Sequence, residues 1–263
     1  MKTEIEQKIS EATNFVREWS KDSVIVVLFS GGKDSLVSLH LSVKACKDKV
    51  IAIHADTTIG IPDNIKYVEN VCNKLGVDLH IGKPYQDYSK LVEKCGFPRP
   101  NYRWCCSLLK IRPMGEIIKK FKLNGYRIVV ADGIRAEESK IRKGFERSSI
   151  HKIWKVPVIH PIFYWNKSDV EKYIELYLKP LGIDINPLYK KGFRRASECW
   201  CPVFKGEKDF ITLANHYPDL FIKLVQIEKK AKSGFSYAYI QNKPFYLSEL
   251  AKKLNIKVEE SLA

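Results

Sequence analysis

The chain has 263 residues, 45% of them hydrophobic and 29% charged, which is typical of a folded water-soluble protein. Its 45 lysines and arginines against 30 aspartates and glutamates give a formal charge of +15, which suits either polyanionic partners or a lysine-rich solvated surface. No apolar run is long enough to span a membrane and the charged N-terminus lacks the apolar core of a signal peptide, so we expect a cytoplasmic protein without membrane partners.

The first expected elements form a strand, a turn and a helix. Residues 1–22 carry apolar side chains at helical spacing and predict an N-terminal amphipathic helix. An apolar, β-branched run at 24–29 meets the turn Ser-Gly-Gly-Lys-Asp-Ser at 30–35, after which leucines recur at helical spacing. This order predicts a buried strand, a glycine turn and a helix that begins at the turn.

The turn at 30–35 has the composition of a phosphate-binding loop. Adjacent glycines let backbone N–H groups converge on an anion, and the following helix points the positive end of its dipole into the same space. A lysine adds a cation, and an aspartate adds a carboxylate suited to Mg²⁺. The residues that we assign to this loop are Ser30, Gly31, Gly32, Lys33, Asp34 and Ser35.

Strands and helices alternate through the middle of the chain. We expect strands at 49–56, 77–81 and 126–133, and helices at about 35–46, 62–75, 85–95, 107–122 and 167–178. This alternation predicts an α/β fold whose parallel, five-stranded-type sheet has helices on both faces. Ligands gather at the carboxyl ends of such strands, where the loop, Asp56, Gly133 and Arg135 meet.

The remaining segments are less regular. The polar, basic stretch 134–150 predicts a mobile loop, and the Pro-interrupted stretch 154–165 predicts an edge strand or extended segment. Residues 207–263 read as lysine-rich helices. We therefore divide the chain into the N-terminal helix 1–22, a nucleotide-binding domain at 23–205 and a helical appendage at 206–263.

Five of the seven cysteines are expected in or beside loops, where they suggest chemistry and not disulfides. Cys105 and Cys106 lie between basic residues at a helix start, which favours thiolates. Cys199 and Cys201 repeat this combination far downstream. The two pairs are suited to one iron–sulfur cluster or one zinc ion, and separate buried thiols are the alternative.

Several spaced motifs together resemble the phosphoadenosine phosphosulfate reductase family, within the PP-loop ATP pyrophosphatase superfamily. The motifs are FSGGKDS at 29–35, HADTTIGIPDNIKYV at 54–68, GFPRPNYRWCCSLLK at 96–110, DGIRAEESKIR at 132–142, HPIFYWNKSDVEKYI at 160–174 and NPLYKKGF at 186–193. The resemblance implies an adenine nucleotide α-hydrolase-like fold that binds ATP or an adenylyl sulfonucleotide with Mg²⁺. It also implies that the loop holds phosphate, that Asp56 lies near the nucleotide or metal, and that Gly133 and Arg135 line the site.

Two departures from the reductases guide the interpretation. The phosphate loop is intact, which favours cleavage of ATP, and no cysteine follows Cys201 to serve as the reductases' C-terminal nucleophile. Cys105 and Cys106 match the tandem pair of the iron–sulfur type, whereas Cys199 and Cys201 have one residue between them instead of two.

We interpret the chain as an ATP-dependent adenylating enzyme of sulfur metabolism, with Lys33, Asp34 and Arg135 as catalytic residues. Its cysteines would carry a [4Fe–4S] cluster in preference to zinc, and its acceptor would be tRNA, DNA or a small molecule. A sulfur donor or a thiol reductant protein is a further partner of this interpretation, and the oligomeric state stays open. The alternatives are an adenylyl-sulfate or phosphoadenylyl-sulfate reductase that produces sulfite, and a metal-containing nucleic-acid-binding protein without turnover.

Overall fold

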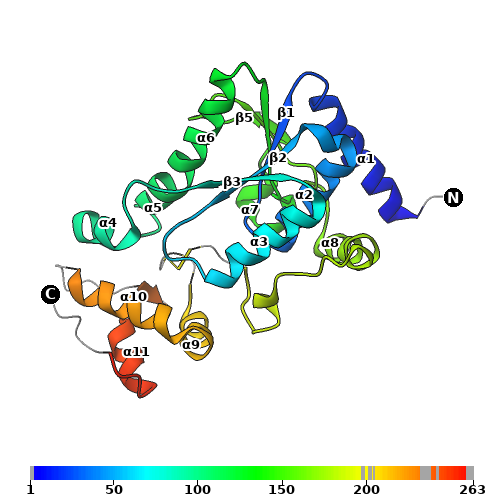
Figure 1. Cartoon of the computed structure of the whole chain (residues 1–263). Helices are drawn as coiled ribbons and strands as arrows, with labels where there is room; N and C mark the ends of the chain where they lie inside the picture. The colour runs from blue at the N-terminus through cyan, green and yellow to red at the C-terminus, as the bar shows by residue number, and fades with distance from the viewer. Residues whose placement is uncertain are drawn as a thin grey trace.

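A six-stranded sheet forms the centre of the molecule (Figure 1). The computed structural model describes residues 3–196, 199–200, 203, 205–231, 238–240 and 243–258. In spatial order the strands are β3 (Asp78–Gly82), β2 (Val50–Ala55), β1 (Val24–Leu28), β4 (Ile128–Ala131), β6 (Pro157–Ile159) and β5 (Ser148–Ile150). All neighbouring pairs are parallel except β5 with β6. The predicted α/β fold with a largely parallel sheet is confirmed.

The helices cover both faces of this sheet because the central strands are apolar on both sides. Ile25 and Val27 of β1 point into a core shared with α1 (Glu4–Trp19), α2 (Lys33–Cys46), α3 (Pro62–Leu75) and α8 (Lys167–Tyr173). Val26, between them, points to the opposite face and packs with Ile118 of α6 (Arg112–Leu123). The continuous apolar run of β1 therefore reflects burial on two faces.

A second core packs helices from the middle of the chain against the C-terminal helices. The elements around it include α4 (Tyr88–Cys95), α5 (Trp104–Cys106), a π-helical turn (Ser107–Ile111), α9 (Glu207–His216), α10 (Pro218–Lys230) and α11 (Leu247–Lys253). In Figure 1 the helices α9, α10 and α11 lie together at one end of the molecule. No helix among the described residues has the length and apolar character needed to cross a membrane.

Three short elements lie outside the expected secondary structure. The stretch 134–150, expected as a loop, contains α7 (Lys140–Lys143) and the antiparallel strand β5. The C-terminal part contains a hairpin of β7 (Ala238–Ile240) and β8 (Lys243–Phe245) between its helices. Strand β5 consists of two serines and an exposed isoleucine and buries none of them, so backbone pairing with β6 fixes it without an apolar pattern.

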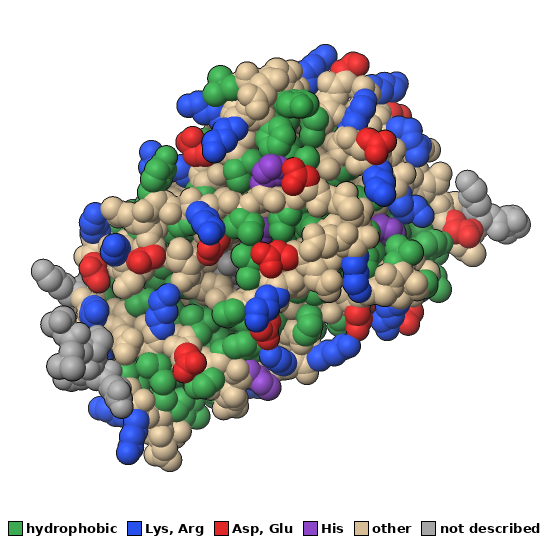
Figure 2. Space-filling view, in the orientation of Figure 1, with side chains coloured by type: hydrophobic (Ala, Val, Ile, Leu, Met, Phe, Trp, Pro, Cys, Tyr) green, Lys and Arg blue, Asp and Glu red, His purple; other side chains and the backbone are tan. Residues whose placement is uncertain are grey.

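The positive charge is dispersed over the visible surface. In Figure 2 lysine and arginine side chains alternate with acidic ones across this face instead of gathering in one patch. This distribution matches the solvated-surface reading of the +15 charge on the face shown.

Candidate functional site

The turn between β1 and α2 is shaped by one glycine with a positive φ. Gly31 has φ +85°, and a Cβ there would lie 2.4 Å from Asn64 Oδ1, so only glycine fits. Gly32 is the N-cap of α2 and gives that helix no side-chain cap. The N-terminus of a 14-residue helix thus faces the turn with its dipole available to an anion.

Two adjoining cavities lie beside this turn. The smaller has a volume of about 230 Å³, and the larger, of about 430 Å³, extends toward α8 and residues 194–196. Both are bordered by Ser30, Gly32, Asp34, Glu138 and Arg142. The smaller is also lined by Ser35 and Gly133, and the larger by Lys33 and Arg135. Residues from the loop and from the end of β4 are therefore brought together.

Arg135 connects the segment after β4 to the first turn of α2. Its Nε donates to Asp34 Oδ1 at 2.7 Å and one terminal nitrogen donates to Glu137 Oε2 at 2.9 Å. The Arg135 side chain is 9% exposed and that of Asp34 is 31% exposed. The guanidinium is therefore fixed at the wall of the cavity, while the Asp34 carboxylate still reaches solvent.

Lys33 lies between an aromatic ring and a carboxylate. Its ammonium group is 4.8 Å from the centre of the Tyr189 ring and 3.6 Å from Glu171 Oε1. Its backbone N–H donates to the Tyr189 hydroxyl at 3.4 Å. Burial raises the pKa of Tyr189 above its usual value, so this hydroxyl stays protonated at neutral pH.

Gly133 allows the β4 turn to touch the helix start. A Cβ on Gly133 would lie 2.6 Å from the backbone of both Asp34 and Ser35. The preceding residue, Asp132, accepts hydrogen bonds through Oδ1 from the Ile134 N–H at 2.9 Å and from His160 Nδ1 at 2.7 Å. These two hydrogen bonds fix the turn after β4 and join it to the residue that follows β6.

Two buried asparagines hold the back of the phosphate loop. Asn64 is 0% exposed and Asn186 is 1% exposed, and their side chains are joined by a 2.8 Å hydrogen bond. Together with Tyr189 they are site residues that the sequence reasoning did not single out. The available signal was their position within the motifs at 54–68 and 186–193.

An apolar cavity of about 120 Å³ opens at the carboxyl ends of β1 and β2. Its walls are formed by Leu28, Phe29, Ser30, Ile53, His54, Ala55, Lys110 and Met114. His54 is 1% exposed and its Nδ1 hydrogen-bonds the Phe29 carbonyl at 2.7 Å. The loop thus has an apolar space on one side and a charged space on the other.

Asp56 is placed apart from these cavities. Its Oδ1 accepts the backbone N–H of Thr58 at 2.8 Å and so closes the turn after β2. It does not line any of the three cavities around the loop. Its predicted contact with the nucleotide or metal therefore remains a prediction.

Four of the five cysteines expected in or beside loops lie in or against the second core, and none of these four lines a cavity beside the phosphate loop. Cys105 is buried there, and Cys95, Cys106 and Cys199 pack against the same apolar cluster. Cys201 lies outside the described residues. Within the described ranges no three His, Cys, Asp or Glu side chains come together in a group able to hold a metal ion. Because one of its four cysteines lies outside the described residues, the predicted ligand set remains a prediction.

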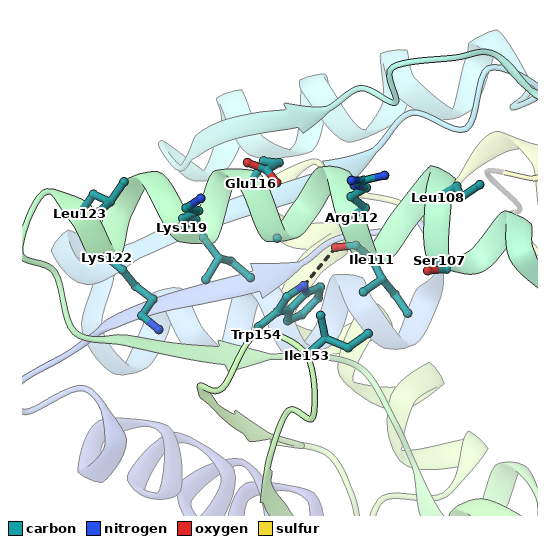
Figure 3. Close-up of a pocket in the computed structure, with 12 residues that line it drawn as sticks. Ser107, Leu108, Ile111, Arg112, Glu116, Lys119, Lys122, Leu123, Ile153 and Trp154 are labelled. Atoms are coloured by element: carbon teal, nitrogen blue, oxygen red, sulfur yellow. Dashed lines mark hydrogen bonds between the residues drawn. The ribbon is translucent and has the colours of Figure 1, made fainter.

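A further cavity, of about 690 Å³, lies on α6, away from the loop (Figure 3). Figure 3 shows Trp154 below the helix, its ring N–H directed at the Ile111 carbonyl at 3.0 Å. Met114 of α6 faces the apolar strand-end cavity instead. The two cavities therefore border different faces of one helix.

The chain matches the family model for the phosphoadenosine phosphosulfate reductase domain over residues 24–202. An uncharacterised protein of Methanocaldococcus jannaschii is 34% identical over 221 residues, which cover 80% of this chain and 49% of that protein. The chain thus spans about half the length of this relative. Sulfate adenylyltransferase subunit 2 of Marinobacter nauticus is 26% identical, over 74% of this chain and 70% of its own.

Solved structures agree on the fold. The phosphoadenylyl-sulfate reductase of Candida auris, solved as a phosphate complex, superposes with a TM-score of 0.52 at 20% identity. The match covers 74% of this chain and 94% of that structure. At this identity the likeness concerns the fold alone.

Proposed function

The chain belongs to the phosphoadenosine phosphosulfate reductase domain family, and from this premise we propose that it is an ATP-dependent adenylating enzyme of sulfur metabolism. In this reaction a nucleophile of the acceptor attacks the α-phosphorus of ATP. The bond from the α-phosphorus to the bridging oxygen breaks, and its electron pair leaves with pyrophosphate. The acceptor gives up its proton and carries the adenylyl group.

The observation that carries this proposal is the N-terminus of α2 at the glycine turn, where the N-cap residue Gly32 supplies no side-chain cap. A departing pyrophosphate gains negative charge, and N–H groups already aimed at that charge stabilise it without reorganisation. Sulfonucleotide reduction releases no pyrophosphate, so it gives no reason for this loop to be complete. Of the described side chains that line the larger cavity, six are cationic and three are acidic. These residues are Lys33, Arg135, Arg142, Lys167, Arg194, Arg195, Asp34, Glu138 and Glu171.

The two kinds of space around the loop suit the two ends of ATP. The apolar cavity at the ends of β1 and β2 suits a planar base, and the cationic cavity suits the phosphates. Ser30 borders both, so an ATP molecule that spans the two cavities would have its α-phosphate near the loop. Lys33 and Arg135 are then positioned to neutralise the charge that develops during bond cleavage.

Asp34 is the residue that we propose to hold Mg²⁺. Proteins hold this ion through one or two carboxylates, with substrate phosphates and water as the remaining ligands, so a single partly exposed carboxylate fits. The ion, when bound, neutralises phosphate charge. No step is assigned to an iron–sulfur cluster, because Cys201, one of its four predicted ligands, lies outside the described residues.

The test uses ATP labelled at the α-phosphate, Mg²⁺ and, in separate reactions, sulfate, sulfide, tRNA and DNA. We expect pyrophosphate and a labelled adenylylated product with one of these acceptors, and Asp34→Ala should abolish both. Asp48→Ala is the matched control. Asp48 is exposed just before β2, at the end of that strand opposite to the one that borders the apolar cavity. Sulfite release from an adenylyl sulfonucleotide with a thiol reductant, without ATP cleavage, would establish the reductase instead.

A further inference from the structure

The two carbonyl groups of the phosphate loop are held by buried amides. Asn64 Nδ2 donates to the Ser30 carbonyl at 3.1 Å, and Asn186 Nδ2 donates to the Gly31 carbonyl at 3.3 Å. Asn186 Nδ2 also donates to Asn64 Oδ1 at 2.8 Å, and Asn186 Oδ1 accepts the Leu188 N–H at 3.0 Å. Each asparagine thus holds one loop carbonyl, and Asn186 also holds Asn64.

These bonds determine where the loop N–H groups point. In a trans peptide the carbonyl and the N–H of the next residue point in opposite directions. Because the carbonyls of Ser30 and Gly31 turn toward the asparagines, the N–H groups of Gly31 and Gly32 turn away from them. The Gly32 N–H accordingly faces the Ser30 hydroxyl, at 3.4 Å, on the side where both residues line the cavity.

We propose that Asn64 and Asn186 are positioning residues that aim the loop N–H groups at the bound phosphates. The proposal rests on the proposed function, which supplies those phosphates. Tyr189, three residues after Asn186, holds the next part of the loop through its hydroxyl, which accepts the Lys33 N–H. One short segment after the sheet therefore fixes the peptide groups of both Gly31 and Lys33.

If the two asparagines served only the stability of the fold, each variant would lose phosphate affinity in proportion to its loss of stability. Asn186→Asp separates the two roles because it keeps the side-chain shape and the acceptor for Leu188. The introduced carboxylate faces two oxygens, Gly31 O and Asn64 Oδ1, so burial and repulsion raise its pKa. In its protonated form it regains one O–H donor for the loop.

The experiment measures binding of inorganic pyrophosphate with Mg²⁺ by calorimetry at pH 8.0 and pH 5.5. We expect Asn186→Leu to lose about tenfold to hundredfold in affinity at both values, because the Gly31 carbonyl has lost its buried donor. Asn186→Asp should show the same loss at pH 8.0 and recover most of it at pH 5.5, relative to the wild type at each pH. Asn73→Leu is the control, since Asn73 is exposed on the same helix as Asn64.

Two outcomes would overturn the positioning role. One is wild-type affinity in Asn186→Leu, and the other is an affinity of Asn186→Asp that does not depend on pH relative to the wild type. If the wild type itself binds neither pyrophosphate nor ATP, the proposed function fails. Hydrogen exchange of residues 29–35 without ligand then still tests the loop geometry: we expect faster exchange in Asn186→Leu, and unchanged exchange would contradict it.

Discussion

Gly133→Ala tests whether the β4 turn must touch the start of α2. The added Cβ would lie 2.6 Å from the carbonyl carbon of Asp34 and from the amide nitrogen of Ser35. Ordinary contacts begin near 3.4 Å, so the two backbones must separate by about 0.8 Å. Both belong to regular structure or its immediate ends, and neither can rotate aside as a side chain would.

Overpacking of this kind costs about 1–3 kcal/mol in stability. For a chain of this size that corresponds to a fall in Tm of about 2–10 °C. The same displacement moves the α2 N-terminus away from Arg135, so we expect ATP affinity to fall at least about tenfold. The ATP affinity of Gly133→Ala should fall by more than that of a variant destabilised to the same extent at a distant position.

Differential scanning calorimetry and ATP titration measure the two effects. Gly206→Ala is the matched control, because its Cβ meets only Asp209 Oδ2, at 3.8 Å, and its φ of −108° is ordinary. A Gly133→Ala protein with wild-type ATP affinity and wild-type Tm would refute the argument. A fall in Tm with unchanged ATP affinity would show that the contact serves the fold alone.

Three further predictions concern stability. Burial lowers the pKa of His40 from 6.5 to about 4, so the unfolded chain binds its proton first and the stability of the fold should decrease as the pH drops from about 6.5 toward 4. Urea titrations at several pH values should show a weaker dependence of stability on pH in His40→Gln than in the wild type. Glu228 accepts the first two N–H groups of α11, so Glu228→Ala should cost about 1–3 kcal/mol and speed hydrogen exchange in α11. The Tyr217 hydroxyl and Lys191 hold the pKa of Asp63 below 3.8, so this network stabilises the fold above pH 3.8 and its contribution is lost on further acidification. Lys191→Met should lower the free energy of unfolding by no more than about 1 kcal/mol at pH 7, because the pair is partly exposed. Unfolding curves measured in acid should show a smaller difference between this variant and the wild type.

The strand–turn–helix unit at 24–46 was predictable because its signals are local. The apolar run, the adjacent glycines and the helical spacing each act within a few residues, and the structure has β1 and α2 there. Strand β5 was not predictable in this way, because it has only three residues, buries none of them, and depends on pairing with β6. The β7–β8 hairpin is equally short.

The candidate site shows the same division between local and distant causes. The loop residues could be named from the sequence, but Asn64 and Asn186 are 122 positions apart and meet only through the fold. Asn64 lies in the first turn of α3 and Asn186 caps the short turn that follows it, so neither residue signals a distant buried partner in the sequence. Asp56 illustrates the converse, since its carboxylate closes its own turn, as an aspartate at a strand end commonly does.

Three cations of the site already lie against carboxylates before any anion binds. Asp34 holds Arg135, Glu171 lies near Lys33, and Glu138 bonds Arg142. Phosphate binding therefore exchanges one anionic partner for another, and its net gain depends on how firmly the carboxylates hold. A magnesium ion at Asp34 weakens that carboxylate's hold on Arg135 and leaves the guanidinium to the phosphates. We therefore expect metal and nucleotide to strengthen each other's binding reciprocally, as linkage requires.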